Sequence, residues 1–204
     1  FDAPCSKSDA PRLQTLTEYW GELKTLKAVP TVKVDGTSTT LSMDERGQVH
    51  VYSRNWELDS MSSNMQLAKR FQLDKMLWPG MAVQFELCGP GIQSNRLKLP
   101  AQRPFVFAVW KDRHKIDRDQ WPTGMPNLAV PELDENEWAL TGSVDDMIAK
   151  VDGLRGNVTK DRLDEGIVWH LHEDQQLSEG LANELGSNRC FKIINNKYLT
   201  KNGL

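Results

Sequence analysis

Short strand-like runs between glycine- and proline-containing turns dominate this sequence, and strands and helices do not alternate regularly. The predicted strands are residues 31–34, 38–43, 49–53, 82–88, 104–110, 166–171 and 191–194. The predicted helices cover residues 9–27, 64–73 and 143–151. A parallel sheet needs a long crossover connection, usually a helix, between successive strands. The pattern therefore predicts an α+β fold with mostly antiparallel sheets.

Composition excludes several classes of protein. The 204 residues predict one large domain, and a net charge of −3 excludes a strongly basic nucleic-acid coat but not a locally basic groove. Apolar runs such as residues 106–110 are too short to span a bilayer, so no membrane partner is expected. Cys5, Cys88 and Cys190 are widely spaced and form no CxxC motif. This spacing favours a reducing, cytoplasmic location over a disulfide framework, and it leaves nuclear and viral origins open.

A lysine stands beside a glycine turn in residues 31–36, which read TVKVDG. Asp35 lies two residues beyond Lys33, so the two side chains are expected on the same face of a strand. Gly36 allows a sharp turn and a close approach of a ligand to the backbone. Lys33 is a candidate amine nucleophile, which must lose a proton before it attacks. The alternative is a solvated lysine at a sheet edge.

Four other charged residues mark the ends or centres of predicted strands. Arg54 follows the hairpin after the lysine strand, Glu86 lies within a strand that leads into a glycine loop, Glu165 precedes a buried strand, and Lys192 lies inside an apolar one. A charge in such a strand costs several kcal/mol unless it is paired. We therefore expect these acids and lysines to have partners and to converge on one nucleotide and one metal ion.

Taken in order, these segments resemble the motifs of the covalent nucleotidyltransferase superfamily, which contains ATP-dependent DNA and RNA ligases and mRNA capping enzymes. The likeness covers residues 12–199 and is strongest to RNA ligases, particularly in residues 86–96 and 191–199. Residues 12–14 resemble the branch whose members carry an OB domain ahead of the catalytic domain. The similar motifs are Lys33-x-Asp35-Gly36 (motif I), Arg54 (motif Ia), Phe107 within residues 105–109 (motif III), Glu165-Gly166 (motif IV) and Lys192 (motif V).

The resemblance implies an ATP-grasp-like ligase domain, built of two mostly antiparallel sheets flanked by helices. Residues 1–204 would form this adenylyltransferase domain, and the first residue, Phe1, favours a domain excised from a chain with an OB domain upstream. Three positions depart from the family pattern. Val32 replaces a glutamate found in many relatives, Ala108 replaces an aspartate, and Ile194 replaces a second motif V lysine, for which Lys197 is a candidate substitute.

The implied activity is that of an ATP-dependent RNA ligase acting through a lysyl-AMP intermediate. Lys33 would attack the α-phosphate of ATP, and AMP would then pass to a 5′-phosphate end and be displaced by a 3′-OH. Lys192 and Lys197 would hold the α-phosphate. Glu165 would bind Mg²⁺ or Mn²⁺, and Glu86 would hold the ribose hydroxyls or share the hydration shell of the metal.

The resemblance also implies a nucleoside-binding set. Phe107 would stack on adenine, although it is also a candidate core residue, and Arg54 would contact the ribose or a phosphate. Gly36 would line the nucleotide site. Asp35 would either contact the nucleotide or orient Lys33.

The expected substrate is a nicked duplex with an RNA 3′-OH end, and the expected state is a monomer. A DNA ligase or a capping-type guanylyltransferase would share Lys33 and Glu165. If the chain is not an enzyme, the alternative is a non-catalytic module that binds a nucleotide or RNA.

Overall fold

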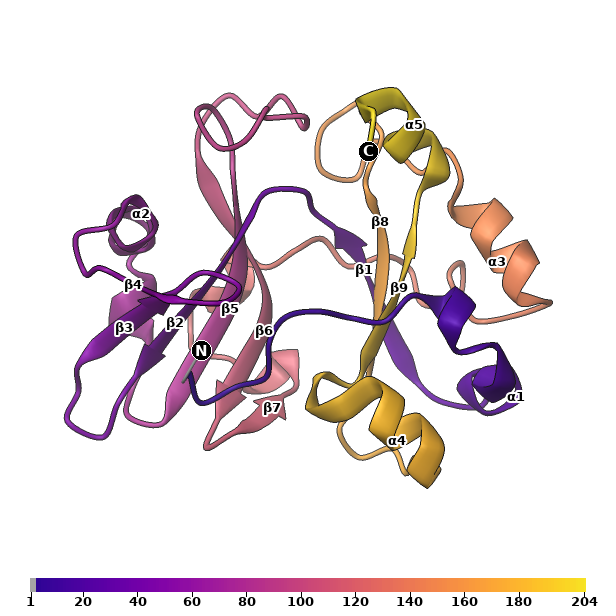
Figure 1. The fold of residues 1–204 in the computed structure, drawn as a ribbon, viewed down its shortest axis with the longest axis horizontal. Helices are drawn as coiled ribbons and strands as arrows, with labels where there is room; N and C mark the ends of the chain where they lie inside the picture. The colour runs from indigo at the N-terminus through magenta and orange to yellow at the C-terminus, as the bar shows by residue number, and fades with distance from the viewer. Residues whose placement is uncertain (1–2) are drawn as a thin grey trace. The chain divides into compact units, whose positions relative to one another are not determined.

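The computed structural model describes residues 3–204, which divide into two compact units, each with its own sheet and core (Figure 1). The six-stranded unit contains residues 3–8 and 35–129, and the three-stranded unit contains residues 9–34 and 130–204. The chain length predicted one large domain. The chain passes between the units after Ser8, Val34 and Ala129. All neighbouring strands are antiparallel, which confirms the predicted α+β class.

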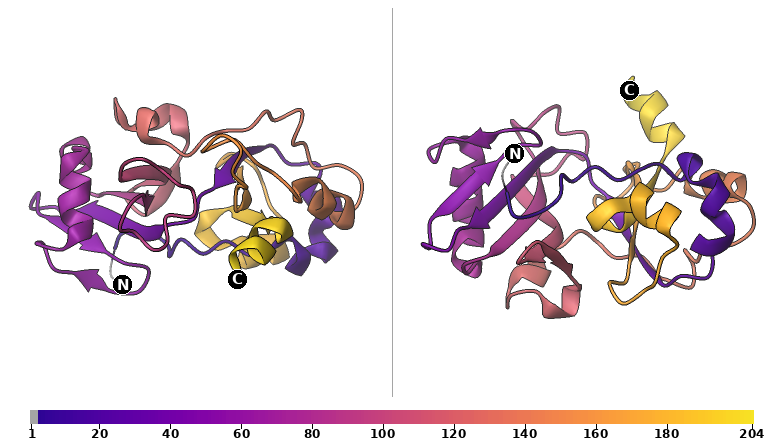
Figure 2. Two further views of the ribbon diagram at one scale, coloured as in Figure 1. Left: turned by 90° about the horizontal axis from the view of Figure 1, so that it is seen from above. Right: turned by 60° about the horizontal axis from the view of Figure 1, so that its bottom comes forward.

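The sheet of the six-stranded unit has the order β4-β3-β2-β5-β6-β7. Its apolar face includes Leu41, Val83 and Phe85 and packs against the helix α2 (Figure 2). The Ser62 hydroxyl caps the first turn of α2. The elements are β2 (Thr37–Met43), β3 (Val49–Tyr52), β4 (Glu57–Leu58), α2 (Ser63–Arg70), η3 (Leu73–Met76), β5 (Met81–Cys88), β6 (Arg103–Lys111), β7 (His114–Ile116), η4 (Arg118–Gln120) and η5 (Met125–Leu128).

The three-stranded unit has the sheet order β1-β8-β9. One sheet face carries Ile167, Trp169 and Phe191, which form a core with residues of α1, α3 and α4. The capping box predicted at the start of α3 is present, because Ser143 and Asp146 bond reciprocally. The elements are η1 (Leu13–Thr15), η2 (Thr17–Tyr19), α1 (Trp20–Leu23), β1 (Ala28–Lys33), α3 (Val144–Val151), β8 (Gly166–Leu171), α4 (Glu179–Leu185), η6 (Gly186–Asn188), β9 (Cys190–Ile194) and α5 (Asn196–Asn202).

The prediction of one helix over residues 9–27 is wrong. The segment before Leu13 is extended, because the Pro11 carbonyl accepts a hydrogen bond from the Lys192 amide and Arg12 bridges to the same residue. The following residues form η1, η2 and α1 instead. Leu13, Leu16 and Leu23 are still fully buried, but short turns place them in the core. In the described residues, no helix is long and apolar enough to cross a bilayer.

Candidate active site

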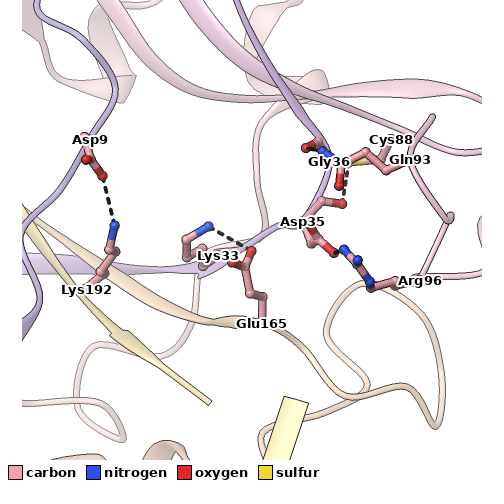
Figure 3. A network of polar contacts seen from close by, with 9 residues as sticks. All are labelled: Asp9, Lys33, Asp35, Gly36, Cys88, Gln93, Arg96, Glu165 and Lys192. Carbon is pink, nitrogen blue, oxygen red and sulfur yellow. Dashed lines mark hydrogen bonds and ion pairs between the residues drawn. The ribbon is translucent and has the colours of Figure 1, made fainter. Parts of the chain in front are cut away.

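Lys33 and Glu165 form an ion pair on the sheet of the three-stranded unit. Lys33 ends β1 and lies opposite Gly166, the first residue of β8. A Cβ at Gly166 would lie 2.1 Å from the Ile193 carbonyl oxygen, so the close approach of β9 requires glycine at this position. The Lys33 Nζ donates to Glu165 Oε2 at 2.8 Å, and the two side chains are 25% and 15% exposed (Figure 3).

Lys192 makes a second ion pair on the same sheet. Lys192 lies opposite Val168, which in turn lies opposite Thr31 of β1. Directly opposed residues and residues two apart share a face, so Lys192 is on the Lys33 face. Its Nζ donates to Asp9 Oδ1 at 3.0 Å (Figure 3). The sequence predicted that the charged residues of this sheet have partners. Lys192 and Glu165 each have one.

Asp9 reaches Lys192 because the backbone around it is paired. The Lys192 amide donates to the Pro11 carbonyl at 2.9 Å, and Asn188 donates to the Asp9 carbonyl at 3.4 Å. The Asp9 carboxylate is nevertheless 71% exposed, whereas the Lys192 side chain is 18% exposed. The lysine is thus held in place at a site that solutes can reach.

Asp35 and Gly36 belong to the six-stranded unit. Because β1 ends at Lys33, strand alternation does not extend to Asp35, and the expectation of a shared strand face is wrong. The Asp35 carboxylate instead accepts a hydrogen bond from Arg96 Nη1 at 2.8 Å (Figure 3). A Cβ on Gly36 would lie 2.2 Å from the Leu87 carbonyl oxygen, and Gln93 donates to the Gly36 carbonyl. The close contact with β5 therefore requires glycine at position 36 even without a ligand.

Glu86 and the phenylalanines of β6 lie on the face of the six-stranded sheet that is opposite α2. Glu86 pairs with Ser38 of β2 and with Phe105 of β6. The register shifts by one residue next to this point, so that Phe107 has no partner on β5. Such a bulge redirects a side chain. Phe107 is half-buried against Ala108 and Trp110, whereas Phe105 is buried beneath the Arg103 guanidinium.

Arg54 and Lys197 lie at the surface of different units. Arg54 is exposed in the turn between β3 and β4, which the Ser53 hydroxyl closes by donating to the Trp56 carbonyl. Lys197 is in the first turn of α5, and its Nζ would lie 3.5 Å from a Cβ on Gly153. Lys197 therefore lies over a loop of its own unit.

The carboxylates suit a hydrated cation better than a metal centre made by protein alone. Within residues 3–204 no group of three His, Cys, Asp or Glu side chains could hold a metal ion. Glu165 and Glu86 belong to different units. Mg²⁺ keeps several waters and binds through one or two carboxylates together with substrate phosphates. Glu165, which is partly exposed beside Lys33, fits that mode of binding.

Three residues that bond to the predicted site residues were not themselves predicted. Asp9 and Arg96 lie 183 and 61 residues from their partners, and no local pattern signals such pairs. Asn195 is fully buried, and its amide N–H donates to the Glu165 carbonyl at 2.8 Å. Its side chain also caps α5, which carries Lys197. The asparagine directly after an apolar strand was the available signal, because asparagine is a preferred helix cap.

A model of a known protein family matches most of the chain. The model of the RNA ligase family matches residues 27–194. The chain belongs to this family. No curated protein sequence matches the chain.

The same fold is found in solved structures of an RNA ligase from Naegleria gruberi. The structure with PPi has 26% identity and a TM-score of 0.78, and it aligns over 100% of this chain and 59% of its own. A lysine-to-alanine variant with ATP and Mn has 26% identity, a TM-score of 0.79 and the same coverage. An arginine-to-alanine variant with ATP and Mn has 26% identity, a TM-score of 0.79, and coverage of 100% and 60%. The chain thus spans about 59% of the length of these relatives.

Proposed function

We propose that this chain is the adenylyltransferase part of an ATP-dependent RNA ligase that seals 3′-OH/5′-phosphate breaks in nicked duplex RNA or RNA/DNA. The observation that carries the proposal is the Lys33–Glu165 pair, with Lys192 on the same face of the sheet. Neighbouring strands lie about 4.8 Å apart. Two lysines two strands apart can therefore approach the same phosphate with their long side chains.

The first step forms a phosphoramidate on Lys33. The Nζ loses a proton and attacks the α-phosphorus of ATP, the bond to the β-phosphate oxygen breaks, and pyrophosphate leaves. Glu165 already accepts a hydrogen bond from this Nζ, so it is placed to hold the departing proton. Lys192 would balance the charge that develops on the α-phosphate. A bound Mg²⁺ or Mn²⁺, for which Glu165 is a candidate ligand, would supply further neutralisation of phosphate charge.

The next two steps also exchange one bond to phosphorus for another. A 5′-phosphate oxygen attacks the lysyl-AMP phosphorus, and the Lys33 nitrogen leaves and regains a proton. A 3′-OH then attacks the 5′-phosphate, loses its proton and displaces AMP. Because all three steps are in-line displacements, positioning and charge neutralisation would supply most of the rate enhancement.

The six-stranded unit would recognise the nucleoside. Phe107 is the accessible aromatic of β6 and would stack on adenine, with Glu86 on the same sheet face to accept from the ribose hydroxyls. Asp35 and Gly36 would shape this site through the turn that Arg96 and Gln93 hold. Arg54 is exposed and would contact the ribose or a phosphate.

Intact-mass measurement after incubation with ATP and Mg²⁺ or Mn²⁺ tests this proposal. We expect the mass to increase by one AMP, and Lys33→Ala to abolish the increase. Lys27→Ala, at an exposed lysine just before β1, is the matched control and should retain it. An adduct formed from GTP would favour a capping-type enzyme, and sealing of DNA nicks alone would favour a DNA ligase. If neither metal supports an adduct, a non-catalytic binding module is the better description.

A further inference from the structure

Five basic residues lie on the loop of residues 152–164 and on α5, the helix beside that loop. The loop leads directly into Glu165, and α5 lies next to it in the same unit (Figure 1). Four of the basic side chains are exposed and that of Arg162 is half-buried. We call this set the basic loop surface: Arg155, Lys160, Arg162, Lys197 and Lys201.

The acids among these residues only partly offset the positive charge. The Asp152 carboxylate accepts from the Asn196 amide at 2.9 Å, and Asp161 is exposed. Asp164 is fully buried, so its carboxyl group is not part of the exposed surface. A cationic surface in a chain with a net charge of −3 therefore marks a place where a polyanion would bind.

The loop is ordered by its own hydrogen bonds. Asp164 Oδ2 accepts from the Asn157 side chain at 2.8 Å and from the Asn157 amide at 3.2 Å. The Gly156 amide donates to the Arg162 carbonyl at 2.9 Å, and Arg155 bridges to Leu163. The basic side chains are thus carried on a backbone that is already fixed, which lowers the entropy cost of binding.

Asn195 connects this loop to both α5 and Glu165. Its side-chain amide donates to the carbonyls of Leu154 and Asp164, at 3.1 and 2.9 Å, and its Oδ1 accepts from the Gly153 amide at 3.0 Å. Because Asn195 also bonds the Glu165 carbonyl, the loop, the helix and the acid of the Lys33 pair are held as one piece.

We propose that the basic loop surface binds the phosphodiester backbone of the RNA strand that is joined, an inference that rests on the proposed ligase function. A strand held there would lie next to the residue that contacts Lys33. The cationic groups recognise phosphates and not base edges, so binding would tolerate any sequence.

The test compares two triple variants with the same change in charge. Arg155→Gln, Lys160→Gln and Lys201→Gln alter the basic loop surface, and Lys69→Gln, Arg70→Gln and Lys75→Gln alter exposed residues of the six-stranded unit. Binding of a single-stranded, 5′-phosphorylated RNA is measured over a range of salt concentrations. Three lost phosphate contacts should weaken binding by about 10-fold and reduce the slope of log K against log salt by about 2. The control variant should bind as the unaltered chain does.

AMP attachment, measured on the same samples, separates this inference from the proposed function. Both triple variants should form the adduct as the unaltered chain does. If the adduct forms but the two variants bind RNA equally, the inference is overturned and the ligase proposal stands. If no chain forms the adduct, the ligase proposal fails, and with it the inference that rests on it. A DNA strand of the same sequence should lose as much affinity, and a loss confined to RNA would contradict recognition through backbone charge.

Discussion

The two units share one architecture but carry different functional residues on it. Each has an antiparallel sheet with one face buried in its own core. On the other face, the three-stranded sheet carries two lysines, each paired with a carboxylate, whereas the six-stranded sheet carries Glu86 and Phe107. Under the proposed function, the three-stranded unit would supply the phosphate chemistry and the six-stranded unit would recognise the nucleoside.

The largest expected effect comes from removing one core aromatic in each unit. Phe85 and Phe191 are fully buried in separate cores. Phe85→Ala and Phe191→Ala should each lower the free energy of unfolding by about 3–5 kcal/mol. Native-state hydrogen exchange should show faster exchange mainly around β5 for the first variant and around β8 and β9 for the second. Equal acceleration in both sheets from either variant would contradict separate cores.

A glycine in each unit provides the next comparison. Gly166→Ala and Gly36→Ala would each bring a Cβ within about 2 Å of a backbone carbonyl, so each should destabilise its unit by about 3 kcal/mol. Outside its own helix backbone and chain neighbours, Gly21 in α1 has no atom within 4 Å of the Cβ position. Gly21→Ala should therefore stabilise the chain slightly, because alanine favours helices. Thermal denaturation of the three variants measures these effects, and unchanged stability of Gly166→Ala would contradict the close approach to Ile193.

The Lys192–Asp9 pair of the three-stranded unit should affect activity. Lys192→Ala should slow AMP attachment by about 100-fold, the usual cost of losing one group that stabilises developing charge. Asp9→Ala should lower the KM for ATP by a few-fold without changing kcat, because the exposed carboxylate competes with phosphate for the Lys192 ammonium. Single-turnover kinetics at several ATP concentrations separates the two effects. A drop in kcat for Asp9→Ala would instead assign Asp9 a direct part in the reaction.

His50 should give the smallest effect, confined to the six-stranded unit. Its Nδ1 lies 2.7 Å from Glu57 Oε1 and its Nε2 lies 3.5 Å from Asp44 Oδ2, and the hydrogen bond to Glu57 is the main reason that the pKa of His50 is raised above 6.5. A raised pKa in the folded state adds stability below pH 6.5, and this stability is lost as the pH rises through the raised pKa. The loss should be under about 1 kcal/mol, because the pair is partly exposed. Denaturant unfolding from pH 5 to 8 should show it, and His50→Gln should remove it.

The sequence predicted elements with a strong local signal and missed those set by distant partners. Short, mostly apolar runs bounded by turn residues located β5, β6, β8 and β9, because such runs are typical of buried strands. The run of leucines in residues 13–26 predicted a helix, but pairing with β9 extended the residues before it. The short helices α4 and α5 were missed, since helices of seven residues have little periodicity.

For the candidate site, the sequence singled out Lys33 and Glu165, and the structure joins them in an ion pair. The partners Asp9 and Arg96 were beyond prediction, because only the folded chain brings them to Lys192 and Asp35. A nucleotide-binding role for Glu86, Arg54 and Phe107 stays a prediction.

The partial burial of Cys5 provides a built-in chemical probe of the chain near its start. Cys5 packs against the cluster that contains Trp110, and burial raises the pKa of its thiol to about 12. The neighbouring Ser6 carbonyl accepts from the side chain of Gln84. At neutral pH the thiol is therefore protonated and slow to react with maleimides. Any event that lifts this segment from β5 would switch on alkylation at Cys5, so the rate of labelling would report how tightly the segment is held while the protein works.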